Sequence, residues 1–342
     1  MGIRDTVGST LESIIGQERT NTIRKVERRA RNALAKRLAI EQPKKKEKTR
    51  SATSLTNPVD SGASAKPEPI RPSRWPSNEP FVPHPTPTMT RHMLLRVLHE
   101  KLRPRTYLEI GIHYGTSLAL SRTRSIGVDP AFKIIRPIHC DVQLVKAPSD
   151  DFFARVDPVG HFDGVPIDLA FIDGMHLSEF ALRDFINTEP LMADTGVVVL
   201  DDMLPRNGPE ADRDRKTKVW TGDVYKVVEI LRRRRPDLVV LLVNTGPTGT
   251  AVVLGVDQAS TILKEAYEED LEYLLRPDPQ LPPQEYLDRS ITVEPDVLLA
   301  SPVWEQLVAH RGRSESADLG ALWDQLRQLP LNDRVVGADG TS

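Results

Sequence analysis

The sequence contains a single cysteine, Cys140, and has no apolar run that approaches the length of a membrane span. One cysteine cannot form an internal disulfide, so a disulfide-stabilised secreted fold is excluded and a reducing compartment is favoured. A spanning helix needs about 20 apolar residues. The N-terminus also has no apolar core typical of a secretory signal. We therefore expect a cytoplasmic protein.

Net charge is low, at −2, but it is unevenly distributed along the chain. Residues 1–50 carry 14 Lys and Arg against 6 Asp and Glu, so the rest of the chain is acidic. Apolar residues between 8 and 40 recur every three or four positions, which predicts a basic amphipathic helix. Such a helix can contact RNA or an anionic membrane through residues 20–50, pair with another helix, or remain a solvated extension.

Composition and periodicity divide the chain into four segments. Residues 1–48 are the basic helical extension, and residues 49–88 are rich in Pro, Ser and Thr, which predicts a disordered linker. Residues 89–257 form the predicted main domain. Residues 258–342 form a helical C-terminal extension, with helices expected at 262–275, 302–311 and 317–329. This extension can pack on the domain, close over a site or mediate a homodimer.

Within the main domain, apolar strands alternate with amphipathic helices. Strands are expected at 107–111, 125–129, 142–145, 167–173 and 196–201, and helices at 93–98 and 177–192. Such alternation predicts an α/β fold, with a mostly parallel open sheet and helices on both faces. Apolar runs at 238–243 and 250–256 flank a short turn, which predicts an antiparallel terminal strand in a hairpin at the end of the sheet.

The first strand runs into a turn that contains two glycines, Gly111 and Gly115, and we expect a helix after it. The dinucleotide-binding fingerprint needs three glycines in the pattern G-x-G-x-x-G, which this turn does not have. The two glycines can let a ligand approach the backbone, or they can serve the turn alone.

Four of the predicted strands end in carboxylates, namely Glu109, Asp129, Asp173 and Asp201, and Asp202 follows the last of them. A single carboxylate in this position can be a helix N-cap. Ligands of open α/β sheets, however, bind beyond the carboxyl ends of the strands, so four in succession favour a binding site. Asp129 follows the glycine turn by about twenty residues, the spacing at which an acidic side chain binds a ribose.

These segments resemble class I S-adenosylmethionine-dependent methyltransferases, in the small-molecule O-methyltransferase form of the catechol and macrolide-sugar type. Residues 108–117 (LEIGIHYGTS) are similar to the first motif of that family, and 127–130 (GVDP) to the second. Residues 147–150 (APSD) resemble the adenine loop, while 172–176 (IDGMH) and 199–202 (VLDD) resemble the motifs after the fourth and fifth strands. The resemblance covers about residues 90–256, and His113 and Tyr114 depart from the glycine-rich centre of the first motif.

The resemblance implies a Rossmann-like domain that binds S-adenosylmethionine. Glu109 would lie near the ammonium group, Asp129 would hold the ribose, and the adenine edge would meet the loop after the third strand. The implied cofactor-binding residues are Glu109, Gly111, Tyr114, Gly115, Ser117, Asp129, Ser149 and Asp150.

The acceptor side of the site would lie at the ends of the fourth and fifth strands. Asp173, Asp201 and Asp202 are candidate ligands for Mg²⁺, which prefers oxygen ligands and keeps positions open for substrate. His176 is the candidate base, acting together with Asp173, because the pKa of histidine lies near working pH. Alternatively, Asp202 is an N-cap and His176 only begins a helix. Without a metal, His176 could still act alone.

Three further features are candidates for a role in the site. The polar stretch 205–218 is a candidate substrate lid. Trp220 and Tyr225 can stack on an acceptor or pack in the core. The run Arg232 to Arg235 complements a helix dipole or binds nucleic acid.

We therefore predict a methyltransferase (EC 2.1.1.-) that uses S-adenosylmethionine and Mg²⁺ to methylate a hydroxyl of a small molecule or glycan. The first alternative is a metal-independent methyltransferase with a nitrogen or carboxylate acceptor. The second is an RNA- or membrane-associated protein that is targeted by its basic N-terminal arm.

Overall fold

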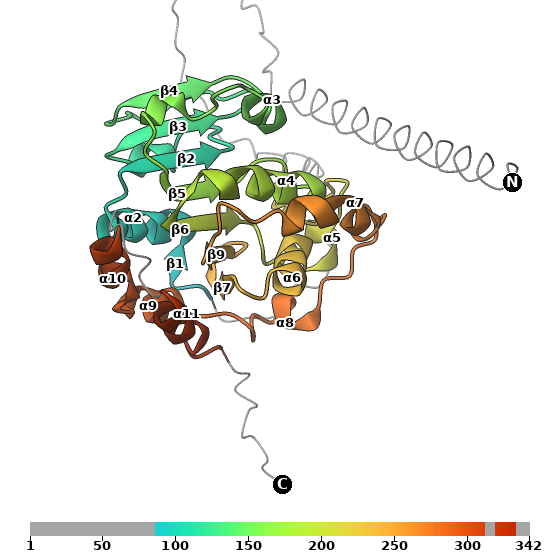
Figure 1. Ribbon diagram of the computed structural model, residues 1–342. Helices are drawn as coiled ribbons and strands as arrows, with labels where there is room; N and C mark the ends of the chain where they lie inside the picture. Colours follow the sequence, from blue (N-terminus) through green and yellow to red (C-terminus); the bar gives the residue numbers. More distant parts are fainter. Residues whose placement is uncertain (1–85, 312–318, 333–342) are drawn as a thin grey trace, which may run out of the picture. The chain divides into compact units, whose positions relative to one another are not determined.

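The computed structural model describes residues 86–311 and 319–332, all of which belong to the unit Arg71–Ser342 (Figure 1). The predicted helical extension 1–48, with the candidate RNA or membrane contact at 20–50, lies outside the described residues. So does almost all of the predicted linker 49–88. None of the described helices combines the length and the apolar character that crossing a bilayer would require.

The described chain alternates strands with helices. The strands are β1 (Met89–Thr90), β2 (Thr106–Ile110), β3 (Arg124–Val128), β4 (Val142–Val145), β5 (Ile167–Ile172), β6 (Met192–Asp201), β7 (Val239–Val243), β8 (Thr245–Gly246) and β9 (Thr250–Leu254). The helices are α2 (Arg91–Leu102), α3 (Ser149–Phe153), α4 (Ser178–Thr188), α5 (Gly208–Ala211), α6 (Tyr225–Arg234), α7 (Ile262–Leu274), α8 (Gln284–Leu287), α9 (Pro295–Ala300), α10 (Val303–His310) and α11 (Gly320–Arg327). Single 3₁₀ turns lie at Leu118–Leu120, Gly160–Phe162 and Glu189–Leu191.

Seven strands form the main sheet, in the order β4-β3-β2-β5-β6-β9-β7 (Figure 1). The pairs from β4 to β6 are parallel, and β9 is antiparallel to both β6 and β7. From β2 the chain builds outward through β3 to β4, and then it returns to add β5 on the other side of β2. The strand order therefore reverses between β2 and β5, which is where an open α/β sheet binds its ligand.

Alternate side chains of each strand enter two separate apolar layers. Leu108 and Ile110 of β2 pack in the layer that contains α4, α6 and α7. Tyr107, on the same strand, packs in the layer that contains α2, α9, α10 and α11. Every residue of β2 is buried, as expected for a strand covered on both faces. The sequence prediction of a mostly parallel α/β sheet with helices on both faces is therefore confirmed.

The structure refines two details of that prediction. The hairpin at the end of the sheet is present, and its second strand, β9, lies between β6 and the edge strand β7. The helix expected after the glycine turn is wrong, because only the 3₁₀ turn Leu118–Leu120 forms there. Gly111, His113 and Gly115 all have positive φ angles, of 90°, 41° and 72°. A right-handed helix cannot include such residues. The short link from Gly115 to the start of β3 at Arg124 forms only the 3₁₀ turn.

The C-terminal extension packs on the sheet. Val293 pairs with Val243 of the edge strand β7, and the side chains of α9, α10 and α11 join the apolar layer that covers α2. Trp304 of α10 is fully buried in this layer, where its Nε1 donates to the carbonyl oxygen of Leu298 at 2.8 Å. The extension thus contributes to the core of the described domain.

We predict that Trp304→Ala destabilises the whole domain by about 3–5 kcal/mol, because it removes a large buried side chain and leaves a cavity. Chemical unfolding followed by circular dichroism measures this change. Leu281→Ala is the matched control, since Leu281 is 84% exposed. Equal stability of the two variants would contradict an integral role for the extension.

Candidate functional site

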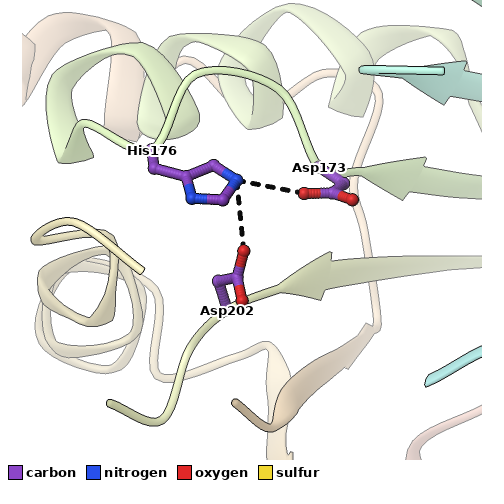
Figure 2. Close-up of side chains that lie close together, drawn as sticks. All are labelled: Asp173, His176 and Asp202. Carbon is purple, nitrogen blue, oxygen red and sulfur yellow. Dashed lines mark hydrogen bonds and ion pairs between the residues drawn. The ribbon is translucent and has the colours of Figure 1, made fainter. Parts of the chain in front are cut away.

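Two carboxylates and one imidazole converge beyond the carboxyl ends of β5 and β6 (Figure 2). Asp173 directly follows β5, His176 precedes α4, and Asp202 directly follows β6. The Nε2 atom of His176 lies 3.2 Å from Oδ1 of Asp173 and 3.1 Å from Oδ2 of Asp202. The three side chains are largely shielded, with 18%, 16% and 8% of their surfaces exposed for Asp173, His176 and Asp202.

The opposite nitrogen of His176 fixes the orientation of the ring. Nδ1 lies 2.7 Å from the carbonyl oxygen of Trp220. A carbonyl can only accept, so Nδ1 carries a proton and donates it. Nε2 is therefore the nitrogen whose protonation can change: with a proton it can donate to the two carboxylates, and without one it can act as a base or bind a cation.

The loop that carries Trp220 reaches His176 because of a glycine. Gly222 has a φ of 60°, and a Cβ at this position would lie 1.7 Å from the carbonyl oxygen of His176. Any other residue would push the two segments apart. The indole of Trp220 stacks on the imidazole, with ring centroids 5.2 Å apart and an interplanar angle of 24°. Gly222 therefore allows both contacts that hold the ring.

Asp202 is held by the turn between β7 and β9. Its φ of 62° is unusual for a residue other than glycine and turns the side chain toward His176. Its Oδ1 accepts a short hydrogen bond from Oγ1 of Thr248. Burial raises the pKa of Asp202, while the charge of His176 acts in the opposite direction. The second oxygen, Oδ2, is the one that faces His176.

Asp201, the third predicted metal ligand, is not part of this converging group. Its Oδ2 lies 2.9 Å from Nη1 of Arg91, at the start of α2, yet it accepts no hydrogen bond from any described residue. Nη2 of Arg91 lies 3.9 Å from Oδ2 of Asp173. Burial raises the pKa of Asp201, and the nearby charges of Asp202 and Asp173 add to this effect. Arg91 thus faces two of the three predicted metal ligands.

The donor set suits a divalent cation. Asp173, His176 and Asp202 each offer a ligand atom within 4.8 Å of the others. The carboxylate oxygens suit Mg²⁺ and Mn²⁺, whereas the imidazole nitrogen suits ions such as Zn²⁺ and Fe²⁺. Arg91 pairs with Asp201 and Asp173, and burial together with the neighbouring carboxylates of Asp202 and Asp173 raises the pKa of Asp201. A divalent cation would relieve the repulsion between these carboxylates, so the residues fit such an ion.

Glu109 is fully buried near the end of β2. Its Oε2 accepts from the hydroxyl of Tyr107 at 2.7 Å, and its Oε1 accepts from Oγ of Ser117 at 2.6 Å. Burial raises the pKa of Glu109 to about 7, although both hydrogen bonds act to lower it. The predicted cofactor residue Ser117 thus holds Glu109 in place.

Both glycines of the turn have close neighbours within the protein. A Cβ on Gly111 would lie 1.9 Å from the carbonyl oxygen of Asp173, and a Cβ on Gly115 would lie 2.8 Å from the side chain of Ile134. Gly111 therefore lets the end of β2 approach the backbone of Asp173. Tyr114, between them, is 44% exposed, and its ring lies 3.8 Å from that of His113.

Asp129 follows β3, the neighbour of β2. Its Oδ2 accepts from the backbone nitrogen of His113 at 2.9 Å, and its Oδ1 accepts from the backbone nitrogen of Ala131 at 2.6 Å. A carboxylate oxygen has a second lone pair, so each can accept another hydrogen bond. The fixed, half-buried carboxylate of Asp129 therefore suits the two hydroxyls of a ribose.

Ser149 and Asp150 begin α3, after β4. The carboxylate of Asp150 accepts two hydrogen bonds from Arg183, at 3.0 and 2.6 Å. The side chain of Ser149 hydrogen-bonds to Asp184, whose pKa burial raises to about 7. The predicted adenine loop is thus attached to α4 by both of its polar side chains.

The remaining predicted features lie near the site or in the core. Arg213, in the candidate lid, pairs with the buried carboxylates of Glu179 and Asp223 at 2.6 and 2.7 Å, which ties this loop to α4. Trp220 stacks on His176, whereas Tyr225 is buried in the apolar layer. The run from Arg232 ends α6, and its residues Arg233, Arg234 and Arg235 pair with carboxylates within the domain.

Sequence reasoning missed Arg91, Thr248 and Gly222. Arg91 stands alone at the start of a helix, and Thr248 belongs to a turn that was read only as a hairpin. Gly222 had a detectable signal, because it lies among polar and aromatic residues just before α6, where a turn with a positive φ is common.

Residues 108–203 match the family model described as "Methyltransferase domain". This segment runs from within β2 to just beyond β6 and contains every residue of the converging group. The predicted resemblance and the prediction of an enzyme are confirmed by this match. Among curated proteins, none matches the chain.

Several solved structures are similar to parts of the chain. The SAH-bound methyltransferase PaMTH1 from Podospora anserina is 16% identical, and the match covers 49% of this chain and 78% of that chain with a TM-score of 0.37. The O-methyltransferase TomG from Streptomyces achromogenes is 18% identical, and the match covers 49% of this chain and 80% of that chain with a TM-score of 0.36. An O-methyltransferase from Bacillus cereus is 16% identical over 51% and 83%, with a TM-score of 0.35.

We predict that Glu109→Gln changes the pH dependence of stability. The pKa of Glu109 is raised in the folded state to about 7, from 4.5, so the folded chain binds more protons than the unfolded chain between these values. Its contribution to stability is therefore lost as pH rises through that range, by roughly 3 kcal/mol in total. Urea unfolding at several pH values should show the variant gaining stability relative to the natural sequence as pH rises. If the stabilities of the variant and the natural sequence changed with pH in parallel, a raised pKa for the buried Glu109 carboxyl would be contradicted.

Proposed function

We propose that this chain, which carries a methyltransferase domain, transfers the methyl group of S-adenosylmethionine to a hydroxyl of a small molecule or glycan with the assistance of Mg²⁺. The observation that carries the proposal is the convergence of Asp173, His176 and Asp202 next to the point where the strand order reverses. The predicted cofactor residues lie nearby, Glu109 on β2 and Asp129 directly after the neighbouring strand β3. Donor and acceptor would therefore meet between β2 and β5.

The cofactor half of the proposal rests on the carboxylates. Asp129, fixed by two backbone N–H groups, would accept from the ribose hydroxyls. Glu109 would face the ammonium group, and a nearby cation would favour its ionised form despite its burial. The remaining predicted cofactor contacts, at Gly111, Tyr114, Gly115, Ser117, Ser149 and Asp150, stay predictions.

Asp173 and Asp202 are the proposed ligands of the cation. A bound Mg²⁺ lowers the pKa of an acceptor hydroxyl and fixes its position. Thr248 holds Asp202, and the backbone turn at Gly111 places Asp173 beside the end of β2. That Asp201 is a third ligand stays a prediction; its Oδ2 faces Arg91, so it would bind the cation through Oδ1 or exchange this ion pair for it.

His176 is the proposed base. Its Nδ1–H is used by the carbonyl of Trp220, so Nε2 would accept the proton of the acceptor hydroxyl. The positive imidazolium that results would lie beside Asp173 and Asp202, which would stabilise it. The acceptor oxygen then forms the new bond to the methyl carbon as the bond from carbon to sulfur breaks, and S-adenosylhomocysteine leaves. Shielding of the site excludes water and keeps donor and acceptor in line.

We predict that EDTA abolishes turnover and that added Mg²⁺ restores it, while S-adenosylhomocysteine still binds to the metal-free chain. Turnover can be followed as release of S-adenosylhomocysteine with a panel of hydroxylated aromatics and sugars, and cofactor binding by calorimetry. Asp202→Asn and Asp173→Asn should each raise the Mg²⁺ concentration that gives half-maximal turnover by at least about tenfold.

Turnover that is insensitive to EDTA would contradict the metal-assisted reaction and would point to a metal-independent enzyme with a nitrogen or carboxylate acceptor. Steeply salt-dependent binding of RNA or anionic vesicles, lost on deletion of residues 1–50, would instead favour a targeting role for the basic arm.

We predict that His176→Asn lowers kcat by about 10²- to 10⁴-fold, the usual contribution of a general base, while cofactor affinity is unchanged. His139→Asn is the matched control, because His139 is exposed and remote in the sequence from the converging group. Metal affinity, measured by titration with Mn²⁺, should change little. A loss of metal affinity as large as that of Asp202→Asn would make His176 a ligand and not the base.

A further inference from the structure

Arg289 is a fully buried arginine that forms no ion pair with the residues the structure describes. It lies between α8 and α9 in the C-terminal extension, with 0% of its surface exposed. No ion pair joins it to a carboxylate of residues 86–311 or 319–332, and its Nε and Nη1 atoms have no hydrogen-bond partner there. Burial lowers the pKa of Arg289 to about 10, the charge of Arg206 adds to this effect, and the charge of Glu210 acts against it. An unpaired buried charge is costly, so its position needs an explanation.

The Arg289 guanidinium makes two hydrogen bonds with described residues, and its acceptors lie in the two segments that hold Asp202. Its Nη2 donates to the carbonyl oxygen of Leu204 at 2.9 Å and to that of Pro247 at 3.2 Å. Leu204 follows Asp202 by two positions in the chain. Pro247 directly precedes Thr248, whose hydroxyl donates to Asp202. One guanidinium group thus bridges both ends of the contact between Thr248 and Asp202.

The neighbouring backbone is shaped around this guanidinium. Gly249 has a φ of 65°, and a Cβ there would lie 2.6 Å from Nη1 of Arg289 and 2.2 Å from the side chain of Leu204. The backbone nitrogens of Met203 and Leu204 donate to the carbonyls of Gly249 and Thr248, at 3.2 and 2.7 Å. The turn and the chain after β6 therefore form one small hydrogen-bonded unit, into which Arg289 inserts.

The segment that carries Arg289 is itself fixed to the sheet. The backbone nitrogen of Val293 donates to the carbonyl of Leu242 at 2.8 Å, and the nitrogen of Asn244 donates to the carbonyl of Val293 at 3.1 Å. Arg289 therefore reaches the site from a rigid base on β7. Groups that orient the ligands of a metal in this way set its affinity.

We propose that Arg289 is a positioning residue for the site: by tying Leu204 to Pro247, it holds Asp202 against Thr248 and keeps Oδ2 of Asp202 directed at His176. The C-terminal extension, which lies beyond the matched methyltransferase segment 108–203, thereby completes the site. This inference rests on the proposed function only in its use of a metal as the readout.

The test compares Arg289→Met with Arg311→Met in the full-length chain. Arg311 is a second shielded arginine of the extension, but it pairs with Asp168 at the opposite, amino end of β5. Mn²⁺ affinity is measured by electron paramagnetic resonance, S-adenosylhomocysteine affinity by calorimetry, and stability by thermal unfolding. Arg289→Met should weaken Mn²⁺ binding by about 10- to 100-fold with unchanged cofactor affinity. Arg311→Met should leave both affinities unchanged, whatever it does to the melting temperature.

Arg289→Lys replaces the methionine variant in this test if that variant does not fold. A lysine can donate to one of the two carbonyls, so its Mn²⁺ affinity should lie between those of Arg289→Met and the natural sequence. The inference is overturned if either Arg289 variant binds Mn²⁺ as tightly as the natural sequence does. It is also overturned if Arg311→Met loses as much Mn²⁺ affinity as Arg289→Met. Absence of Mn²⁺ binding by the natural sequence would instead overturn the proposed function. In that case a crystal structure of Arg289→Met decides: Asp202 displaced from Thr248 supports the inference, and Asp202 still in contact with Thr248 overturns it.

Discussion

The contact of one imidazole nitrogen with two carboxylates is the constraint on which the site depends. His176 can face Asp173 and Asp202 only because its other nitrogen donates to Trp220, and that contact requires a glycine at position 222. The carboxylates come from neighbouring parallel strands, β5 and β6, whose carboxyl ends meet at one edge of the sheet. The sheet thus brings the charges together, and the loops set their directions.

Such a concentration of buried acid is costly without a compensating charge. Arg91 supplies part of that charge, through Asp201 and Asp173, and it comes from the start of the helix that precedes the sheet. Arg289 stabilises the arrangement from the other direction, through backbone carbonyls. The two arginines come from segments on either side of residues 108–203 in the sequence. The site therefore depends on more of the chain than the matched domain alone.

The sequence was informative wherever a local pattern determines local structure. Alternating apolar strands predicted the parallel sheet, and Asp173, His176 and Asp202 were found because each lies at or just after a strand end. The prediction of a helix after Gly111 was wrong. The positive φ of His113 extends the turn, and no pattern of apolar residues in the sequence indicates such an angle at a residue other than glycine. The partners of the site could not be predicted for a different reason. Arg91, Thr248 and Arg289 reach it from distant positions, and only the fold decides which carboxylate or carbonyl each one meets.

A crystal structure with Mn²⁺ and S-adenosylhomocysteine, with the ion located by its anomalous scattering, tests the central claim most directly. The account predicts one ion with oxygens of both Asp173 and Asp202 within about 2.0–2.6 Å, and the imidazole of His176 facing the same cavity. An ion bound elsewhere, or carboxylates that stay directed at protein partners in the presence of excess Mn²⁺, would contradict it.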